Sequence, residues 1–253
     1  MPRTLFLAVM ALLAFLPAVP VSAQTAQTGA QNTPQALKAT YDQAMIAKDW
    51  PAALAAAQQL VDANATSANL LLLGNAQLYV TTGKSDPGPM EVSLATYDRA
   101  LAVAEREKAA QGQADQAQPD QAWKDGVAKI YIGKGNALLK LKRYAEAIDN
   151  YNHAAELSSN PGKAYFNVCA VAYNNGDTAA AVEACRKSVQ ADPTRADAWF
   201  VLGSSLFADA KIDSAGKVAM TAETRQALLK YLDLAPDGPH AVDVKAMLDM
   251  VAK

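Results

Sequence analysis

The sequence predicts an all-α protein built from repeated units. Two features of the composition and one of the residue order predict this fold. Of the 253 residues, 51% are hydrophobic but only 7% are aromatic, and Gly and Pro number just 13 and 12. Small aliphatic residues with few chain breakers favour helices over a twisted sheet. In addition, aromatic and small residues recur at a spacing of 34.

The charge balance and the rarity of histidine and cysteine exclude several classes of function. The chain carries 23 Lys and Arg residues against 25 Asp and Glu residues. This balance lacks the excess of basic charge on which nucleic-acid binding depends, so no nucleic-acid partner is expected. Only two His and two Cys are present, too few for zinc fingers or zinc ribbons. We therefore expect no metal site and no cofactor.

Residues 1–23 have the pattern of a secretory signal peptide. Arg3 gives a positive start, Leu5–Leu16 is an apolar run, and the small residue Ala23 precedes the expected cleavage point. The alternative is a membrane anchor, but about a dozen apolar residues are too short to cross roughly 30 Å of hydrocarbon. We expect cleavage, a flexible N-terminus over 24–33, and an exported product, periplasmic or secreted, without an integral membrane span.

The rest of the chain repeats. When residues 128–161, 162–195 and 196–229 are laid in register, aromatic residues coincide near the start of each unit and small residues coincide after them. The coinciding residues are Tyr131, Tyr165 and Trp199, then Gly135, Cys169 and Gly203, then Ala147, Ala181 and Ala215. Stacked units of this kind bury apolar surface that no single unit can bury alone.

The pattern resembles the tetratricopeptide repeat (TPR). The resemblance covers 34–252 and implies a right-handed superhelical solenoid of about five repeats plus a C-terminal capping helix from His240 to Val251. The segment 105–125 departs from the period, and either a linker or elongated flanking helices would explain its Ala, Gln and charged residues.

The resemblance also implies a concave groove lined by the first helix of each pair. Ile132, Phe166 and Phe200 would form an apolar stripe in it. The other expected binding residues are Asn136, Leu139, Asn167, Tyr173, Asn174, Ser204 and Phe207. Such a surface suits a peptide or a partner helix, unless neighbouring helices or the segment 105–125 cover it.

One TPR subclass grips a C-terminal carboxylate with paired Lys, Asn and Arg side chains. Asn136 and Asn167 match its two Asn positions. Ile132, Asp197 and Val201 stand where basic residues are needed. This clamp is therefore broken in the present chain.

The two cysteines would fall on the two helices of one repeat. A disulfide between Cys169 and Cys185 would stabilise an exported protein by about 3 kcal/mol. The alternative is a pair of buried thiols that act as small apolar residues. Both possibilities remain open at this stage.

The sequence thus predicts a non-catalytic adaptor of the cell envelope that binds a protein or peptide. No G-x-S-x-G or H-E-x-x-H motif occurs, and His153 and His240 have no surrounding acid–base motif. The alternatives are a structural subunit of an envelope assembly and an enzyme whose site carries no recognisable motif.

Overall fold

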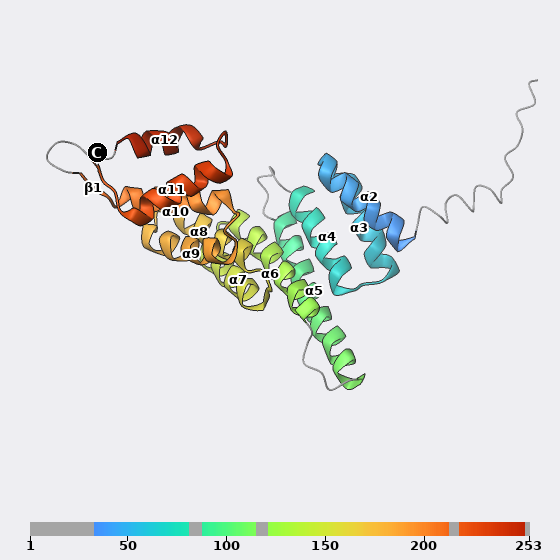
Figure 1. Cartoon of the computed structure of the whole chain (residues 1–253). Coiled ribbons are helices and arrows are strands. Elements are labelled where there is room, and N and C mark those ends of the chain that lie inside the picture. Colours follow the sequence, from blue (N-terminus) through green and yellow to red (C-terminus); the bar gives the residue numbers. More distant parts are fainter. Residues whose placement is uncertain (1–32, 81–87, 115–120, 213–217, 251–253) are drawn as a thin grey trace, which may run out of the picture.

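Antiparallel helix pairs follow one another along the described chain (Figure 1). The computed structural model describes residues 33–80, 88–114, 121–212 and 218–250. The pairs are α2 (Pro34–Ala47) with α3 (Trp50–Ala63), α4 (Ser67–Val80) with α5 (Gly88–Ala114), α6 (Gln121–Lys140) with α7 (Tyr144–Leu157), α8 (Gly162–Asn174) with α9 (Thr178–Ala191), and α10 (Ala196–Ala208) with α11 (Ala222–Leu234). A final helix, α12 (Ala241–Asp249), follows. The predicted all-α solenoid is confirmed. The signal peptide expected over 1–23 and the repeat position Ala215 lie outside the described residues.

A short antiparallel ladder interrupts the helical pattern between α10 and α11. Strand β1 (Lys211–Ile212) pairs with β2 (Val218–Ala219). Two residues on each side make only a small exception to the helical architecture.

The turn between the two helices of a pair recurs with the same backbone geometry. Lys48, Lys142 and Gly176 occupy the corresponding position in three repeats, with φ of 58°, 60° and 76°. This left-handed conformation ends the first helix and reverses the chain. Asp49 and Asp177 then cap the second helix, because each carboxylate accepts a backbone N–H three residues further on, at 3.1 and 3.0 Å.

Within a pair, a large side chain of one helix fills the space left by a small residue of the other. We call this position the slot. Gly135 faces Tyr151 so closely that a Cβ on Gly135 would lie 2.5 Å from Cε1 of the ring. Gly74 faces Tyr97 in the same way, with a Cβ distance of 2.7 Å to Cε1. Only glycine allows this approach, and both rings are fully buried.

Other repeats fill the slot differently. In the first repeat the sizes are exchanged, since Tyr41 stands on the first helix and Ala57 on the second, and both are buried. In the fifth, Gly203 faces Leu228. In the fourth, Cys169 and Cys185 form a disulfide, with their Cα atoms 5.1 Å apart. Small residues on α8 and α9 let the two backbones come this close, so the disulfide alternative is the one present in the structure.

Of the two alternatives for residues 105–125, the described part of this segment forms elongated helices. Helix α5 continues to Ala114 and α6 begins at Gln121. The far end of α5 projects beyond the neighbouring helices (Figure 1). The extension is tied to α6 because the Trp123 indole N–H donates to the carbonyl of Ala104 at 3.0 Å. The Lys108 ammonium lies 4.5 Å from the centre of the same indole ring.

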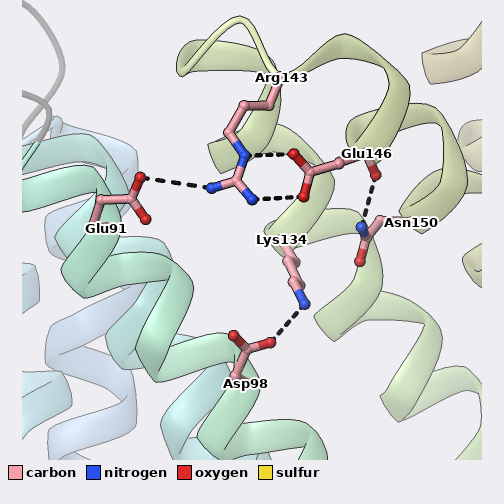
Figure 2. A network of polar contacts seen from close by, with 6 residues as sticks. All are labelled: Glu91, Asp98, Lys134, Arg143, Glu146 and Asn150. Atoms are coloured by element: carbon pink, nitrogen blue, oxygen red, sulfur yellow. Dashed lines mark hydrogen bonds and ion pairs between the residues drawn. The ribbon is translucent and has the colours of Figure 1, made fainter.

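An ionic network joins the second repeat to the third (Figure 2). The Arg143 guanidinium donates two hydrogen bonds to the Glu146 carboxylate, at 2.6 and 2.5 Å, and also lies 3.6 Å from Glu91 of α5. Lys134 of α6 donates to Asp98 of α5 at 2.6 Å. The hydrogen bonds to Arg143 lower the pKa of Glu146, and the bond to Glu146 raises the pKa of Arg143. The network therefore holds α5 against the next pair.

Helix α12 covers the end of the stack. Ala241 and Val244 are buried against Leu228 and Tyr231 of α11. The Tyr231 hydroxyl accepts the backbone N–H of His240 at 2.9 Å and fixes where α12 begins. This matches the predicted cap, whose last residue, Val251, lies outside the described ranges. In the described part of the chain no helix is long and apolar enough to cross a bilayer.

Candidate functional site

A cleft of about 610 Å³ runs along the face formed by the first helices of the pairs. This volume is in the usual range for sites that bind ligands. The lining comes from α2, α4, α6, the α7–α8 connection, the start of α8 and the residue before α10. Its members are Met45, Leu71, Asn75, Tyr79, Asp125, Ala128, Lys129, Ile132, Gly133, Asn136, Ser158, Ser159, Asn160, Lys163 and Arg195.

The N-terminal end of the cleft is apolar. Met45 of α2 and Leu71 of α4 are half-buried there, and Tyr79 lies beside them with 37% of its surface exposed. The Tyr79 ring stacks on Trp50 with 4.8 Å between ring centroids and 15° between planes. This stacking orients the ring, which offers apolar contact area at little further entropic cost.

Two asparagines stand in the middle of the cleft, one on α4 and one on α6. The Tyr97 hydroxyl donates to Asn75 Oδ1 at 2.7 Å, and the Tyr151 hydroxyl donates to Asn136 Oδ1 at 2.8 Å. Burial raises the pKa of both tyrosines, so both hydroxyls remain protonated and can donate at neutral pH. The slot tyrosines thus hold the two amides in place.

The third repeat leaves amide donors available to a ligand. The carbonyl oxygen of Asn136 is taken by Tyr151, whereas its NH₂ group has no hydrogen-bond partner among the residues that the structure describes. Asn75 also forms a side-chain hydrogen bond with Tyr41. This bond lowers the pKa of the Tyr41 phenol, whereas burial raises it. A polar ligand would therefore meet a fixed donor at Asn136.

Basic side chains gather toward the C-terminal end of the cleft. Lys129 of α6 and Lys163 of α8 are exposed, and Arg195 precedes α10. The Asp125 carboxylate faces the same region but is engaged by Ser159, whose N–H and hydroxyl donate to it at 2.7 and 2.8 Å. These bonds lower the pKa of Asp125. They also fix the α7–α8 connection that forms one wall.

Arg195 connects the cleft to the aromatic residues behind it. Its guanidinium carbon lies 5.5 Å from the centre of the Phe166 ring, and its Nη2 is 3.2 Å from Asp192. Its Nε is buried without a hydrogen-bond partner among the described residues. The cation is thus positioned by its contact with an aromatic ring and by one carboxylate.

The third helix pair is the part of the chain that a protein-family model recognises. The model of the tetratricopeptide repeat matches residues 128–161. The slot and the turn found in this pair recur in its neighbours, as described above. Residues 128–161 are a tetratricopeptide repeat, set within a solenoid of the TPR fold.

Solved structures with the same TPR fold cover most of the chain. PilW, described as a type IV pilus biogenesis factor, is 14% identical with a TM-score of 0.59, and the match covers 89% of this chain and 88% of that one. MamA from Desulfovibrio magneticus RS-1 is 14% identical with a TM-score of 0.53, covering 81% and 97%. YrrB, described as a TPR protein with an unusual peptide-binding site, is 17% identical with a TM-score of 0.50, covering 88% and 97%. At these identities the likeness concerns the fold. No curated protein matches the sequence significantly.

The cleft of this TPR protein contains two of the predicted groove residues, Ile132 and Asn136. Leu139 and Tyr173, near the ends of α6 and α8, are 36% and 40% exposed but do not line it. Phe166 is half-buried beneath Arg195. The remaining predicted residues outside the cleft lining are Asn167, Asn174, Ser204 and Phe207, of which Ser204 is buried.

Phe200 is covered from within the chain. Its ring stacks on His240 with 3.8 Å between centroids and 3° between planes, and it also packs against Tyr231. The capping helix thus closes the apolar stripe at the fifth repeat. A stripe open from Ile132 through Phe200 was expected, and the difference arises because the cap residues pack on the first helix of the last pair.

Sequence reasoning missed several residues of the cleft, although two signals for them exist. Asn75 directly follows the slot glycine Gly74, just as Asn136, which was predicted, follows Gly135. Lys129 and Lys163 are 34 residues apart, at the same position of consecutive repeats. The apolar end, which combines α2 with α4, has no comparable signal because only the packing of the helices brings it together.

A second depression, of about 360 Å³, lies beside the extension of α5 and α6. It contains His153 and Glu156, with 3.7 Å between Nδ1 and Oε2. Both side chains are more than half exposed, and no Ser or Cys is among the described lining residues. Within the described ranges, no group of three or more His, Cys, Asp or Glu side chains could hold a metal ion. The first cleft is therefore the stronger candidate site.

Proposed function

We propose that this TPR protein is a non-catalytic interaction module that holds an extended peptide segment of a partner protein in the cleft. The observation that carries the proposal is the pair Asn75 and Asn136, held one repeat apart by Tyr97 and Tyr151. An extended peptide exposes a backbone carbonyl at each residue, and the NH₂ group of Asn136 can donate a hydrogen bond to one of them. The apolar wall beside them would take side chains of the peptide.

The dimensions of the cleft suit a short segment. Packed helices lie about 8–10 Å apart, so the distance across α4, α6 and α8 is about 20 Å. An extended chain advances about 3.3 Å per residue, which gives about six residues. A peptide of this length covers both the apolar end and the basic end. The peptide-binding site attributed to YrrB, which has the same fold, supports this kind of ligand.

We further propose that the protein works in the cell envelope after export. The N-terminal 23 residues have the order of a signal peptide. The disulfide between Cys169 and Cys185 is buried in the fourth repeat. Structural disulfides persist in oxidising compartments such as the periplasm and are rare in the cytosol. Determining the N-terminal residue of the protein isolated from its own cells tests cleavage after Ala23.

Site-specific crosslinking in the producing cells tests the peptide-binding function. A photoreactive amino acid is placed at Ile132 in the cleft and, as the matched control, at Asn150 on α7. We expect a defined protein adduct from position 132 and none from position 150. Adducts from position 150 alone would contradict binding in the cleft. They would instead favour the second candidate, a structural subunit of an envelope assembly that makes contact through its outer face.

A pair of asparagine variants tests the contribution of the amide. Asn136→Leu removes the donor that faces the cleft and keeps a side chain of similar size. Asn150→Leu removes a half-buried amide outside the cleft, which donates to the Glu146 carbonyl at 2.7 Å. We expect the first variant to weaken the crosslink from position 132 and the second to leave it unchanged, with the same helical circular dichroism in both.

A further inference from the structure

We propose that the peptide held in the cleft is polarised, with acidic side chains over α6 and α8 and apolar side chains over α2 and α4. This inference rests on the peptide-binding function proposed above and adds the chemistry of the partner. It depends on how charge and apolar surface are distributed along the cleft.

The basic end has an excess of positive charge that the chain does not neutralise. Lys129 and Lys163 line the cleft, and neither forms an ion pair with any residue in the described ranges. Asp125 is the only carboxylate among the described lining residues. Its oxygens already accept hydrogen bonds from Ser159 and Gln121. The Asp125 carboxylate also interacts electrostatically with Lys129, but one carboxylate does not balance the cations of the lining, so a ligand carboxylate would meet a net positive charge.

Arg195 adds a third cation with a fixed orientation. Asp192 lies 3.2 Å from Nη2, and the guanidinium carbon lies 5.5 Å from the centre of the Phe166 ring. The side chain keeps 27% of its surface exposed at the edge of the cleft. The guanidinium carries five donors, so one carboxylate of the chain leaves capacity for a second one from a ligand.

The spacing of the two lysines fits an extended acidic segment. Lys129 and Lys163 hold the same position in consecutive repeats and line the same cleft. Side chains on one side of an extended peptide recur about every 6.6 Å. Two acidic residues two or three positions apart can therefore each approach one lysine.

At the opposite, N-terminal end of the cleft, none of the described lining residues is charged. Met45, Leu71 and Tyr79 present methyl, methylene and ring surface there. Burying a Leu, Met or Phe side chain of a ligand against such surface is favourable because apolar area is removed from water. A charged side chain at that end would lose hydration without gaining a partner. The two ends of the cleft thus select opposite chemistries, and the peptide has a defined direction along the stack.

Selection from a random dodecapeptide phage library, using the purified protein with its disulfide intact, tests the proposal. We expect the selected peptides to carry Asp or Glu in one half and Leu, Ile, Met or Phe in the other. A synthetic copy of the best peptide should bind K129E/K163E at least about tenfold more weakly at moderate salt. The control K140E/K245E carries the same charge change outside the cleft lining and should bind within about twofold of the unchanged protein. Added salt should weaken binding to the unchanged protein.

The possible outcomes separate the two proposals. Selected peptides without acidic residues, or equal affinity for K129E/K163E and the control pair, would overturn the acidic partner while leaving peptide binding in place. Failure to select any peptide would overturn the peptide-binding function itself. Competition by a single-stranded DNA of similar length would mean that the basic end takes any polyanion, and it would equally overturn the acidic peptide as the specific partner.

Discussion

Cys169 and Cys185 occupy, in the fourth repeat, the slot that Gly135 and Tyr151 fill in the third. Both pairs are 16 residues apart, and they are offset from each other by 34 residues. In the third repeat a buried ring fills the space beside a glycine. In the fourth, two short side chains joined by a covalent bond take its place. The same structural position is thus filled by a packed ring in one repeat and by a disulfide in the next.

The equivalence predicts that the disulfide can be replaced by the glycine–tyrosine pair. We expect C169G/C185Y to fold and its thermal midpoint to be independent of reductant. In the unchanged protein, reduction should lower the free energy of unfolding by about 2–4 kcal/mol, because the unfolded chain loses a covalent constraint. Thermal unfolding followed by circular dichroism, with and without dithiothreitol, measures both effects.

A second variant shows whether filling the slot matters. C169A/C185A removes the bond without adding a ring, and it should be less stable than C169G/C185Y under reducing conditions because a cavity remains. Equal stability of the two variants would contradict the idea that slot volume is what the tyrosine and the disulfide have in common.

Gly135 should be intolerant of a methyl group. In Gly135→Ala the new Cβ would meet Cε1 of Tyr151 at 2.5 Å, inside contact distance, and we expect a loss of about 1–3 kcal/mol from overpacking. Gly126 is the control on the same helix, because nothing lies within 4 Å of a Cβ placed there. Gly126→Ala should instead stabilise α6 by up to about 1 kcal/mol. Urea unfolding of both variants measures the difference in sign, and a loss of stability at both positions would argue against the slot.

Replacing Lys142 with glycine should stabilise the protein. Its φ of 60° lies in the left-handed region, where a side chain is disfavoured and glycine is not. We expect Lys142→Gly to raise the free energy of unfolding by about 0.5–1 kcal/mol. Gly176→Ala, at the corresponding turn of the fourth repeat with φ of 76°, should lower it by about 1 kcal/mol. Chemical unfolding of the two single variants gives both values. A loss of stability in Lys142→Gly, or a gain in Gly176→Ala, would contradict the equivalence of the two turns.

Alkaline pH should unfold the protein through its slot tyrosines. Burial raises the pKa of Tyr41 to about 12 and also raises the pKa of Tyr97 and Tyr151. An unfolded tyrosine titrates near pH 10, so the contribution of burial to stability is complete below about pH 10 and is lost as the pH rises from there toward the folded-state pKa. Stability should therefore fall above pH 10, by up to about 1.4 kcal/mol per pH unit for each tyrosine.

Phenylalanine variants test whether buried tyrosines cause this loss of stability at alkaline pH. Tyr97→Phe should make the decline above pH 10 shallower, since it removes one buried titrating group. Tyr144→Phe removes a tyrosine that is 37% exposed and serves as the control. Urea unfolding at pH 9, 10 and 11 compares them. An unchanged slope in Tyr97→Phe would show that other groups control alkaline unfolding.

The fold could be predicted from the sequence because its signals are local and repeated. Gly135, Cys169 and Gly203 recur at a spacing of 34, and each lies at a contact between helices of one pair. The candidate site was predicted only in part. Ile132 and Asn136 line the cleft, whereas Phe200 lies under His240, since the cap packs on the last pair. The spacing of residues in the sequence does not indicate which surface of the solenoid the C-terminal capping helix covers.

The sequence by itself determined the helix pairs, their order and the turns between them, because helix propensity, capping and the size of neighbouring side chains act over a few residues. It left open whether the two cysteines bond, which the 5.1 Å between their Cα atoms decided. The tertiary structure alone brought Met45 and Tyr79 to one end of a cleft and Lys163 and Arg195 to the other. These residues are up to 150 positions apart, and only the stacking of rigid helix pairs brings such distant side chains together.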